Sequence, residues 1–237
     1  MAEYAIKIYN GQSIETQIDL HASNLSPHLP ACMEAIQRLL QQSLDNLHIL
    51  ELGAGVGLTG LKVATELKCN VALTDLPVAM SLLEQNIDLN RHQFLNGPDA
   101  VFAAPLPWGQ NAFEDGTLQN VISKLFHQSS NKSALETDLS TSHKPIMILA
   151  SDCVYYEELH EPLEETLAAI LSTAHPDSIC LIAGMRRWKR DNTFYKKLGR
   201  RTRTSLGTLD CTCIYEKVER VESREILRVF CIRWILS

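Results

Sequence analysis

The sequence lacks a surplus of positive charge and any apolar run long enough to cross a membrane. Its 22 Lys and Arg residues are outnumbered by 28 Asp and Glu residues, which gives a formal net charge of −6, whereas a generic nucleic-acid binder needs the opposite balance. Apolar runs such as residues 145–150 fall far short of the roughly 20 residues that a membrane-spanning helix needs. No charged-then-apolar leader is present at the N-terminus. We therefore expect a soluble cytoplasmic protein, with the nucleus as an alternative location, that binds a protein or a small molecule and neither nucleic acid nor membrane.

Cysteine is present, but not in a pattern typical of disulfides or of zinc. The seven cysteines are odd in number and mostly lie within apolar runs, which indicates reduced thiols packed in the core. The only close pair, Cys211 and Cys213, has a one-residue gap instead of the usual zinc spacing, and no His follows it at ligand distance. We expect these two residues to lie in a strand, and we expect no metal site.

The length and composition favour one domain over two. A chain of 237 residues with 45% hydrophobic content is long enough for one large α/β domain. Around Asn10-Gly11, loosely alternating apolar residues predict a small β-hairpin or arm over about residues 1–28. Residues 128–143 contain five Ser and two Thr, and we expect them to form a mobile insertion within the single domain 1–237.

A glycine-rich stretch at residues 49–60 (ILELGAGVGLTG) predicts a strand, a tight turn and the start of a helix. Glycine allows positive φ and close approach of the backbone to a ligand, and the helix N–H groups would point at that ligand. Residues 55–60 also match the G-x-G-x-x-G pattern of dinucleotide enzymes. Glu51 favours S-adenosylmethionine instead, because a carboxylate at the strand end would repel a pyrophosphate but suit a ligand with a sulfonium, an ammonium and a ribose. A glycine-rich turn with no ligand remains the alternative.

Apolar runs alternate with helical periodicity along the rest of the chain. This pattern predicts a doubly wound parallel sheet of about seven strands, covered by helices and ending in a hairpin. A helix over 186–203 would carry nine of the 22 basic residues, either as a solvated face or as a docking site for an acidic partner. The predicted strands are 48–52, 70–75, 100–104, 145–150, 178–184, 211–218 and 226–235, and the other predicted helices are 32–42, 58–67, 78–90, 118–125 and 161–172.

Four chemically distinctive residues follow or end predicted strands: Glu51, Asp75, Trp108 and Asp152. In open α/β sheets ligands bind outside the carboxyl ends of the strands. We therefore expect these side chains to converge on one site. The structural alternatives are that Asp75 and Asp152 cap helices and that Trp108 is a buried loop anchor.

Several of these segments together resemble the seven-β-strand methyltransferases, and within them the protein-lysine methyltransferases typified by the Hsp70-directed and valosin-containing-protein-directed enzymes. The matching segments are 51–58 (ELGAGVGL), 74–75 (TD), 108–111 (WGQN), 151–155 (SDCVY) and 190–194 (RDNTF). The resemblance implies a strand order of 3-2-1-4-5-7-6 with strand 7 antiparallel, S-adenosyl-L-methionine as cofactor, and a lysine of a folded protein as acceptor.

By position, the resemblance also implies roles for individual residues. Asp75 would bind the ribose hydroxyls and Trp108 would face the adenine, while Asp152 and Tyr155 would meet the acceptor. Tyr155 could instead be a core aromatic residue. The other residues expected to contact the cofactor are Glu51, Gly53, Gly55, Gly57, Leu76 and Ser151.

Methyl transfer to an amine needs a neutral nucleophile, yet a free lysine has a pKa of roughly 10.4. We expect Asp152 to accept an N–H of the amine and orient its lone pair, and Tyr155 to pack against the acceptor. Two alternatives remain open. The chain could be an arginine or small-molecule methyltransferase, or a catalytically weak binding module, because the Trp that such enzymes usually carry before the first strand is absent from residues 26–34.

Overall fold

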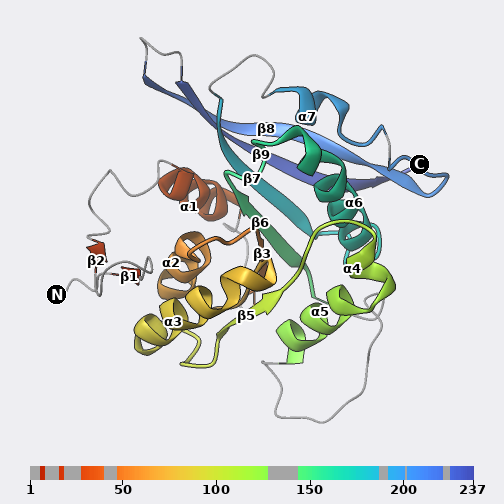
Figure 1. Cartoon of the computed structure of the whole chain (residues 1–237). Coiled ribbons are helices and arrows are strands. Elements are labelled where there is room, and N and C mark those ends of the chain that lie inside the picture. The colour runs from red at the N-terminus through yellow and green to blue at the C-terminus, as the bar shows by residue number, and fades with distance from the viewer. Residues whose placement is uncertain are drawn as a thin grey trace.

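The centre of the fold is a seven-stranded mixed β-sheet with helices on both faces (Figure 1). The structure is a computed structural model that describes residues 6–8, 16–18, 28–39, 47–127, 144–186, 192–200, 202–220 and 225–237. A separate pair of short strands, β1 (Ile6–Ile8) and β2 (Thr16–Ile18), is antiparallel, in agreement with the predicted hairpin. The predicted turn at residues 10–11 and the predicted insertion at 128–143 lie outside the described residues.

The order of the strands in the large sheet is β5-β4-β3-β6-β7-β9-β8. The first five are parallel to one another, while β9 runs antiparallel to both of its neighbours. Counted from β3, this is the predicted order 3-2-1-4-5-7-6 with strand 7 antiparallel, which is confirmed. The strands are β3 (Leu47–Leu52), β4 (Cys69–Asp75), β5 (Val101–Pro105), β6 (Ile146–Ser151), β7 (Ile179–Arg186), β8 (Gly207–Arg220) and β9 (Glu225–Leu236).

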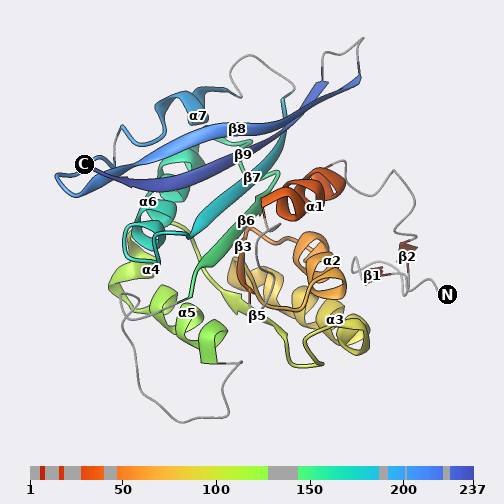
Figure 2. The same ribbon diagram turned by 180° about the vertical axis from the view of Figure 1, so that it is seen from behind.

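Two hydrophobic cores lie on the two faces of the sheet. Helices α1 (His28–Leu39), α2 (Leu58–Glu66) and α3 (Met80–Asn90) contribute buried side chains to one core. Helices α5 (Thr117–His127) and α6 (His160–Leu171) pack against the other face, with α4 (Asn111–Glu114) next to α5. Figures 1 and 2 show these two layers from opposite sides. The central strands are therefore covered on both faces, which explains their nearly continuous apolar sequences.

Short 3-10 helices complete several connections, and two of them matter for the site. The turn η1 (Pro77–Ala79) follows β4, and η4 (Glu157–Leu159) leads into α6. A third, η2 (Arg91–Gln93), follows α3. Among the described helices, none is long and apolar enough to span a bilayer. All seven cysteines are free, five of them are buried, and Cys211 and Cys213 lie in β8 as predicted.

The prediction of one helix over residues 186–203 is wrong. Arg186 is the last residue of β7, and α7 covers only Thr193–Lys197. Leu198 leaves the helix with an extended ψ of 139°, and Gly199 follows with a φ of 77°. The backbone N–H of Gly199 donates to the buried carboxylate of Glu164 over 2.9 Å. A tertiary contact thus ends the helix early, against the local helical periodicity.

Helix α1 begins earlier than the sequence pattern predicts. It starts at His28 instead of residue 32, and Pro30 lies in its first turn. Proline is tolerated there because the first backbone N–H groups of a helix have no partner within the helix. Pro30 therefore belongs to the helix and does not mark its boundary.

Candidate active site

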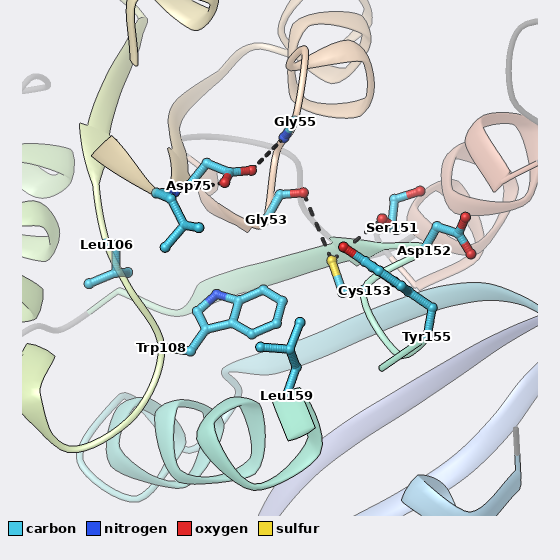
Figure 3. Close-up of a pocket in the computed structure, with 11 residues that line it drawn as sticks. Gly53, Gly55, Asp75, Leu106, Trp108, Ser151, Asp152, Cys153, Tyr155 and Leu159 are labelled. Atoms are coloured by element: carbon cyan, nitrogen blue, oxygen red, sulfur yellow. Dashed lines mark hydrogen bonds between the residues drawn. The ribbon is translucent and has the colours of Figure 1, made fainter. Parts of the chain in front are cut away.

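A pocket of about 280 Å³ lies at the carboxyl ends of β3, β4 and β6 (Figure 3). Eight of the ten residues predicted for the site line it. The lining residues are Gly53, Gly55, Asp75, Leu76, Leu106, Trp108, Ser151, Asp152, Cys153, Tyr155 and Leu159.

The glycine loop after β3 requires glycine for two different reasons. Gly53 has a φ of 63°, and a Cβ atom there would lie 2.9 Å from both Cys153 Sγ and Trp108 Cζ2. Gly55 has a φ of 57°, but a Cβ atom there would meet no heavy atom within 4 Å. Gly53 is therefore packed against the pocket wall, whereas Gly55 faces open space into which a ligand can approach the backbone.

Asp75 binds two backbone N–H groups at the edge of the pocket. Its Oδ2 accepts from Gly55 N over 2.8 Å, and its Oδ1 accepts from Leu76 N over 2.7 Å. The N-cap of η1 is Leu76, and no side chain caps it. The alternative role of Asp75 as a helix cap is therefore wrong. Each carboxylate oxygen has a second lone pair, so both can still accept a hydrogen bond from a ligand.

Glu51 and Gly57 do not line the pocket, unlike the other eight residues predicted for the site. The Glu51 side chain is only 2% exposed, and its Oε2 accepts from Gly60 N, an N–H in the first turn of α2, over 2.9 Å. Burial raises the pKa of Glu51 to about 8, although hydrogen bonds from Gly60 and Thr59 oppose the shift. This carboxylate satisfies a helix N–H that would otherwise lack a partner.

Gly57 supports the loop from the core side. It has a φ of 81° and is the N-cap residue of α2. A Cβ atom at this position would lie 3.0 Å from the side chains of both Leu73 and Leu83. Because Gly57 has no side chain, the start of α2 can pack closely against Leu73 of β4 and Leu83 of α3.

Asp152 adopts a left-handed backbone conformation, with a φ of 56°. It is the one residue other than glycine with a positive φ in the described part of the chain. Its N–H donates to the carbonyl of Ala183 over 2.8 Å, which ties the end of β6 to β7. The N-cap of η4 is Tyr156, with no side-chain cap. Asp152 is therefore not the cap of that segment, and this alternative is wrong.

Tyr155 stands at the mouth of the pocket. It is 59% exposed, as is Tyr156, and the centroids of the two rings lie 4.4 Å apart. The interpretation of Tyr155 as a core aromatic residue is therefore wrong. Partial desolvation, followed by the negative charges of its neighbours, raises the pKa of Tyr155. Figure 3 shows Ser151, Asp152 and Tyr155 on the side of the pocket opposite Asp75 and Leu106.

Trp108 forms the pocket wall between these two sides (Figure 3). Its ring packs against the core beneath α6. The next residue, Gly109, donates its N–H to Thr166 Oγ1 on α6 over 3.0 Å. Trp108 therefore both anchors the loop and lines the pocket, so its two predicted roles are compatible.

Three lining residues were not predicted: Leu106, Cys153 and Leu159. The buried Cys153 thiol lies 3.3 Å from the carbonyl oxygen of Leu52 and 3.4 Å from that of Ser151. Burial raises the pKa of this thiol well above its ordinary value. Cys153 could have been predicted as a lining residue, because it lies in the same loop as the predicted site residues Asp152 and Tyr155. The two leucines carry no signal that separates a pocket wall from a core.

Comparisons with known proteins agree with this geometry. A family model described as "Lysine methyltransferase" matches residues 5–125 and 121–201. The chain is 31% identical over 180 residues to the protein-lysine N-methyltransferase EFM6 of Saccharomyces cerevisiae, covering 68% of this chain and 64% of that protein. It is 33% identical over 153 residues to the protein N-lysine methyltransferase METTL21A of Mus musculus, covering 64% and 55% respectively. The match therefore spans less than two thirds of the length of these relatives.

Among solved structures, the fold is similar to that of PH0793 from Pyrococcus horikoshii. The TM-score is 0.50 at 17% sequence identity, and the match covers 100% of this chain and 74% of that one. At this level of identity the likeness concerns the fold alone.

Proposed function

The chain belongs to the lysine methyltransferase family, and from that premise we propose that it is an S-adenosylmethionine-dependent protein-lysine N-methyltransferase that acts on a folded protein. The observation that carries the proposal is the arrangement of the pocket. Asp75 and the glycine loop form one side, and Asp152 and Tyr155 form the other. A cofactor and an acceptor amine could therefore meet in one cavity.

The residues on the first side fit the proposed cofactor. Asp75 has carboxylate oxygens with acceptor capacity for ribose hydroxyls, and the backbone at Gly55 faces open space. Leu106 and Trp108 offer an apolar wall suited to an adenine ring. S-adenosylmethionine would supply a methyl group on a positively charged sulfur. Gly53, Leu76 and Ser151, which also line the pocket, complete the proposed binding surface.

The residues on the second side fit an amine acceptor. Asp152 would accept a hydrogen bond from the acceptor nitrogen and direct its lone pair into the pocket, and the exposed Tyr155 ring would pack against the aliphatic part of the lysine. A partly apolar site also favours the neutral amine, because desolvation lowers the pKa of lysine. Positioning of a neutral amine would therefore be the main catalytic contribution of this chain.

One experiment tests the function directly. The purified protein is incubated with radiolabelled S-adenosylmethionine and a cell lysate, and the labelled proteins are hydrolysed in acid to methyl amino acids. The expected result is label in methyl-lysine, reduced at least tenfold in initial rate when the Asp152→Asn variant replaces the wild type. Label in methylarginine or in small molecules would replace the proposal with one of the two other acceptor classes.

The binding-module alternative predicts a different outcome. The protein would then bind S-adenosylhomocysteine in calorimetry but transfer no label in any lysate fraction. Binding and transfer are therefore measured on the same preparation.

A further inference from the structure

A second, smaller cavity of about 100 Å³ lies between η4, α6 and α7. It shares no lining residue with the active-site pocket. The two are nevertheless neighbours, because Leu159 of η4 lines the active site and Glu157 of the same turn lines the small cavity. Its lining residues are Glu157, His160, Glu164, Thr193, Phe194 and Lys197.

The walls of this side cavity suit a cationic side chain. Glu164 is 4% exposed and accepts the N–H of Gly199 over 2.9 Å, so its carboxylate is fixed in place. Phe194 is 3% exposed, and an aromatic ring attracts a cation over its face. Glu157 adds a second carboxylate and Lys197 a single ammonium. In the described part of the chain, neither Glu157 nor Lys197 forms an ion pair.

The chain between the two cavities carries negative charge only. Residues 152–165, which run from the end of β6 through η4 into α6, contain no Lys or Arg. They contain six acidic residues, at positions 152, 157, 158, 161, 164 and 165. An acceptor segment that crosses this surface is attracted if it is basic and repelled if it is acidic. Of the two basic residues in α7, Lys196 and Lys197, only Lys197 lines the side cavity.

We propose that the side cavity is a specificity subsite that takes an arginine or lysine side chain of the acceptor protein, close in sequence to the methylated lysine. This inference rests on the proposed function. The exposed rings of Tyr155 and Tyr156 provide the surface over which the segment passes from one cavity to the other. Leu159 and Glu157, which line the two cavities, lie two residues apart in η4, about 4 Å at roughly 2 Å per residue. We therefore expect the basic residue within a few residues of the target lysine.

A binding experiment tests the subsite without any methyl transfer. N-acetyl-L-arginine methylamide is titrated into the isotope-labelled protein at neutral pH, and the backbone amide resonances of Glu157, Thr193 and Phe194 are followed. We expect saturable shifts with the arginine probe. The corresponding glutamate and glutamine probes should bind more weakly. Absence of saturable shifts, or equal binding of the glutamate probe, overturns the proposal.

Three exposed substitutions sharpen the binding test. Glu157→Gln should raise the Kd of the arginine probe about two- to fivefold, and Lys197→Gln should lower it by a similar factor, as expected for single charges near a surface. Glu158→Gln is the matched control, because it makes the same charge change on η4 but lies outside the cavity wall. If Glu158→Gln and Glu157→Gln change the Kd of the arginine probe equally, general electrostatic attraction explains the binding and the subsite is rejected.

A transfer experiment places the subsite relative to the acceptor lysine. Peptides with one lysine in an alanine and glycine background carry an arginine at each nearby position in turn. The expected rate has a maximum at one arginine position close to the lysine, and Glu157→Gln flattens that maximum. Equal rates at all positions contradict the proposal. A protein that binds the arginine probe but methylates nothing contradicts the proposed function alone, whereas methylation without probe binding contradicts the subsite alone.

Discussion

The carboxylate of Asp75 accepts a hydrogen bond from the backbone N–H of Gly55, 20 residues earlier in the chain, over 2.8 Å. Strands β3 and β4 are parallel neighbours, with Leu52 opposite Thr74, so the end of one strand lies beside the loop that follows the other. The same carboxylate also accepts from Leu76 N. Asp75 therefore fixes the glycine loop as well as offering acceptors to the proposed cofactor.

Replacement of Asp75 should weaken cofactor binding. Asp75→Ala removes charge-assisted hydrogen bonds to the ribose and leaves Gly55 N without its acceptor, so S-adenosylhomocysteine affinity should fall by about 1 to 3 kcal/mol. Calorimetry measures the change. Glu84→Ala, which removes an exposed carboxylate on α3, is the control and should bind normally. Unchanged binding by Asp75→Ala would remove the cofactor role from this residue.

A methyl group at Gly53 should affect both stability and binding. Gly53→Ala places Cβ 2.9 Å from Cys153 Sγ and Trp108 Cζ2 and forces Ala into the left-handed region. Gly116→Ala is the control for backbone strain, because Gly116 has a φ of 77° and a Cβ atom there would meet no heavy atom within 4 Å. The control should lose about 1 kcal/mol of stability and bind S-adenosylhomocysteine normally. Gly53→Ala should lose more stability and bind weakly, and equal behaviour of the two variants would contradict the packing argument.

The buried Glu51 predicts a pH dependence of stability. Its pKa is raised from 4.5 to about 8 by burial, so the folded protein holds a proton that the unfolded chain releases. The stability contributed by this group is complete below about pH 4.5 and is lost as the pH rises through about 8. Glu51→Gln does not titrate, and its amide oxygen can still accept from Gly60 N.

Denaturant unfolding of the wild type and Glu51→Gln across this pH window tests the prediction. With rising pH, the free energy of unfolding of the wild type should fall relative to that of the variant, by at most about 1.4 kcal/mol per pH unit. Taking the difference between the two proteins cancels titration of all other groups. Parallel pH curves would mean that Glu51 keeps an ordinary pKa.

Asp152 is tested by a substitution that preserves its backbone conformation. Asp152 has a φ of 56°, and Asn tolerates the left-handed region about as well as Asp does. Asp152→Asn should therefore melt near the wild-type temperature and bind S-adenosylhomocysteine normally. Its rate of methyl transfer should fall by one or more powers of ten, about 1.4 kcal/mol per decade. A wild-type rate would end the catalytic assignment of this residue.

Local sequence pattern determined most of the segments that form strands and helices. Apolar runs with no polar alternation, such as residues 146–150, are typical of central strands covered on both faces, and they are buried as expected. The positions of Asp75 and Asp152 at strand ends were equally visible, because parallel strands bring their carboxyl ends to one edge of the sheet. The order of the strands came from resemblance to the family and not from the pattern.

The tertiary structure decided what each side chain at that edge faces. Glu51 is the last residue but one of β3 and Asp75 is the last residue of β4, yet Glu51 accepts the N–H of Gly60 in α2 and does not line the pocket. Glu51 is still paired within β3, on the same face as Ile49, which belongs to the core that α2 covers. A local pattern does not show which helix covers that face. Contacts between segments far apart in the chain matter in the same way. Glu164 accepts the N–H of Gly199 just after α7, and Glu164 and Phe194 both line the side cavity. Such contacts depend on packing between elements, for which a local pattern carries no signal.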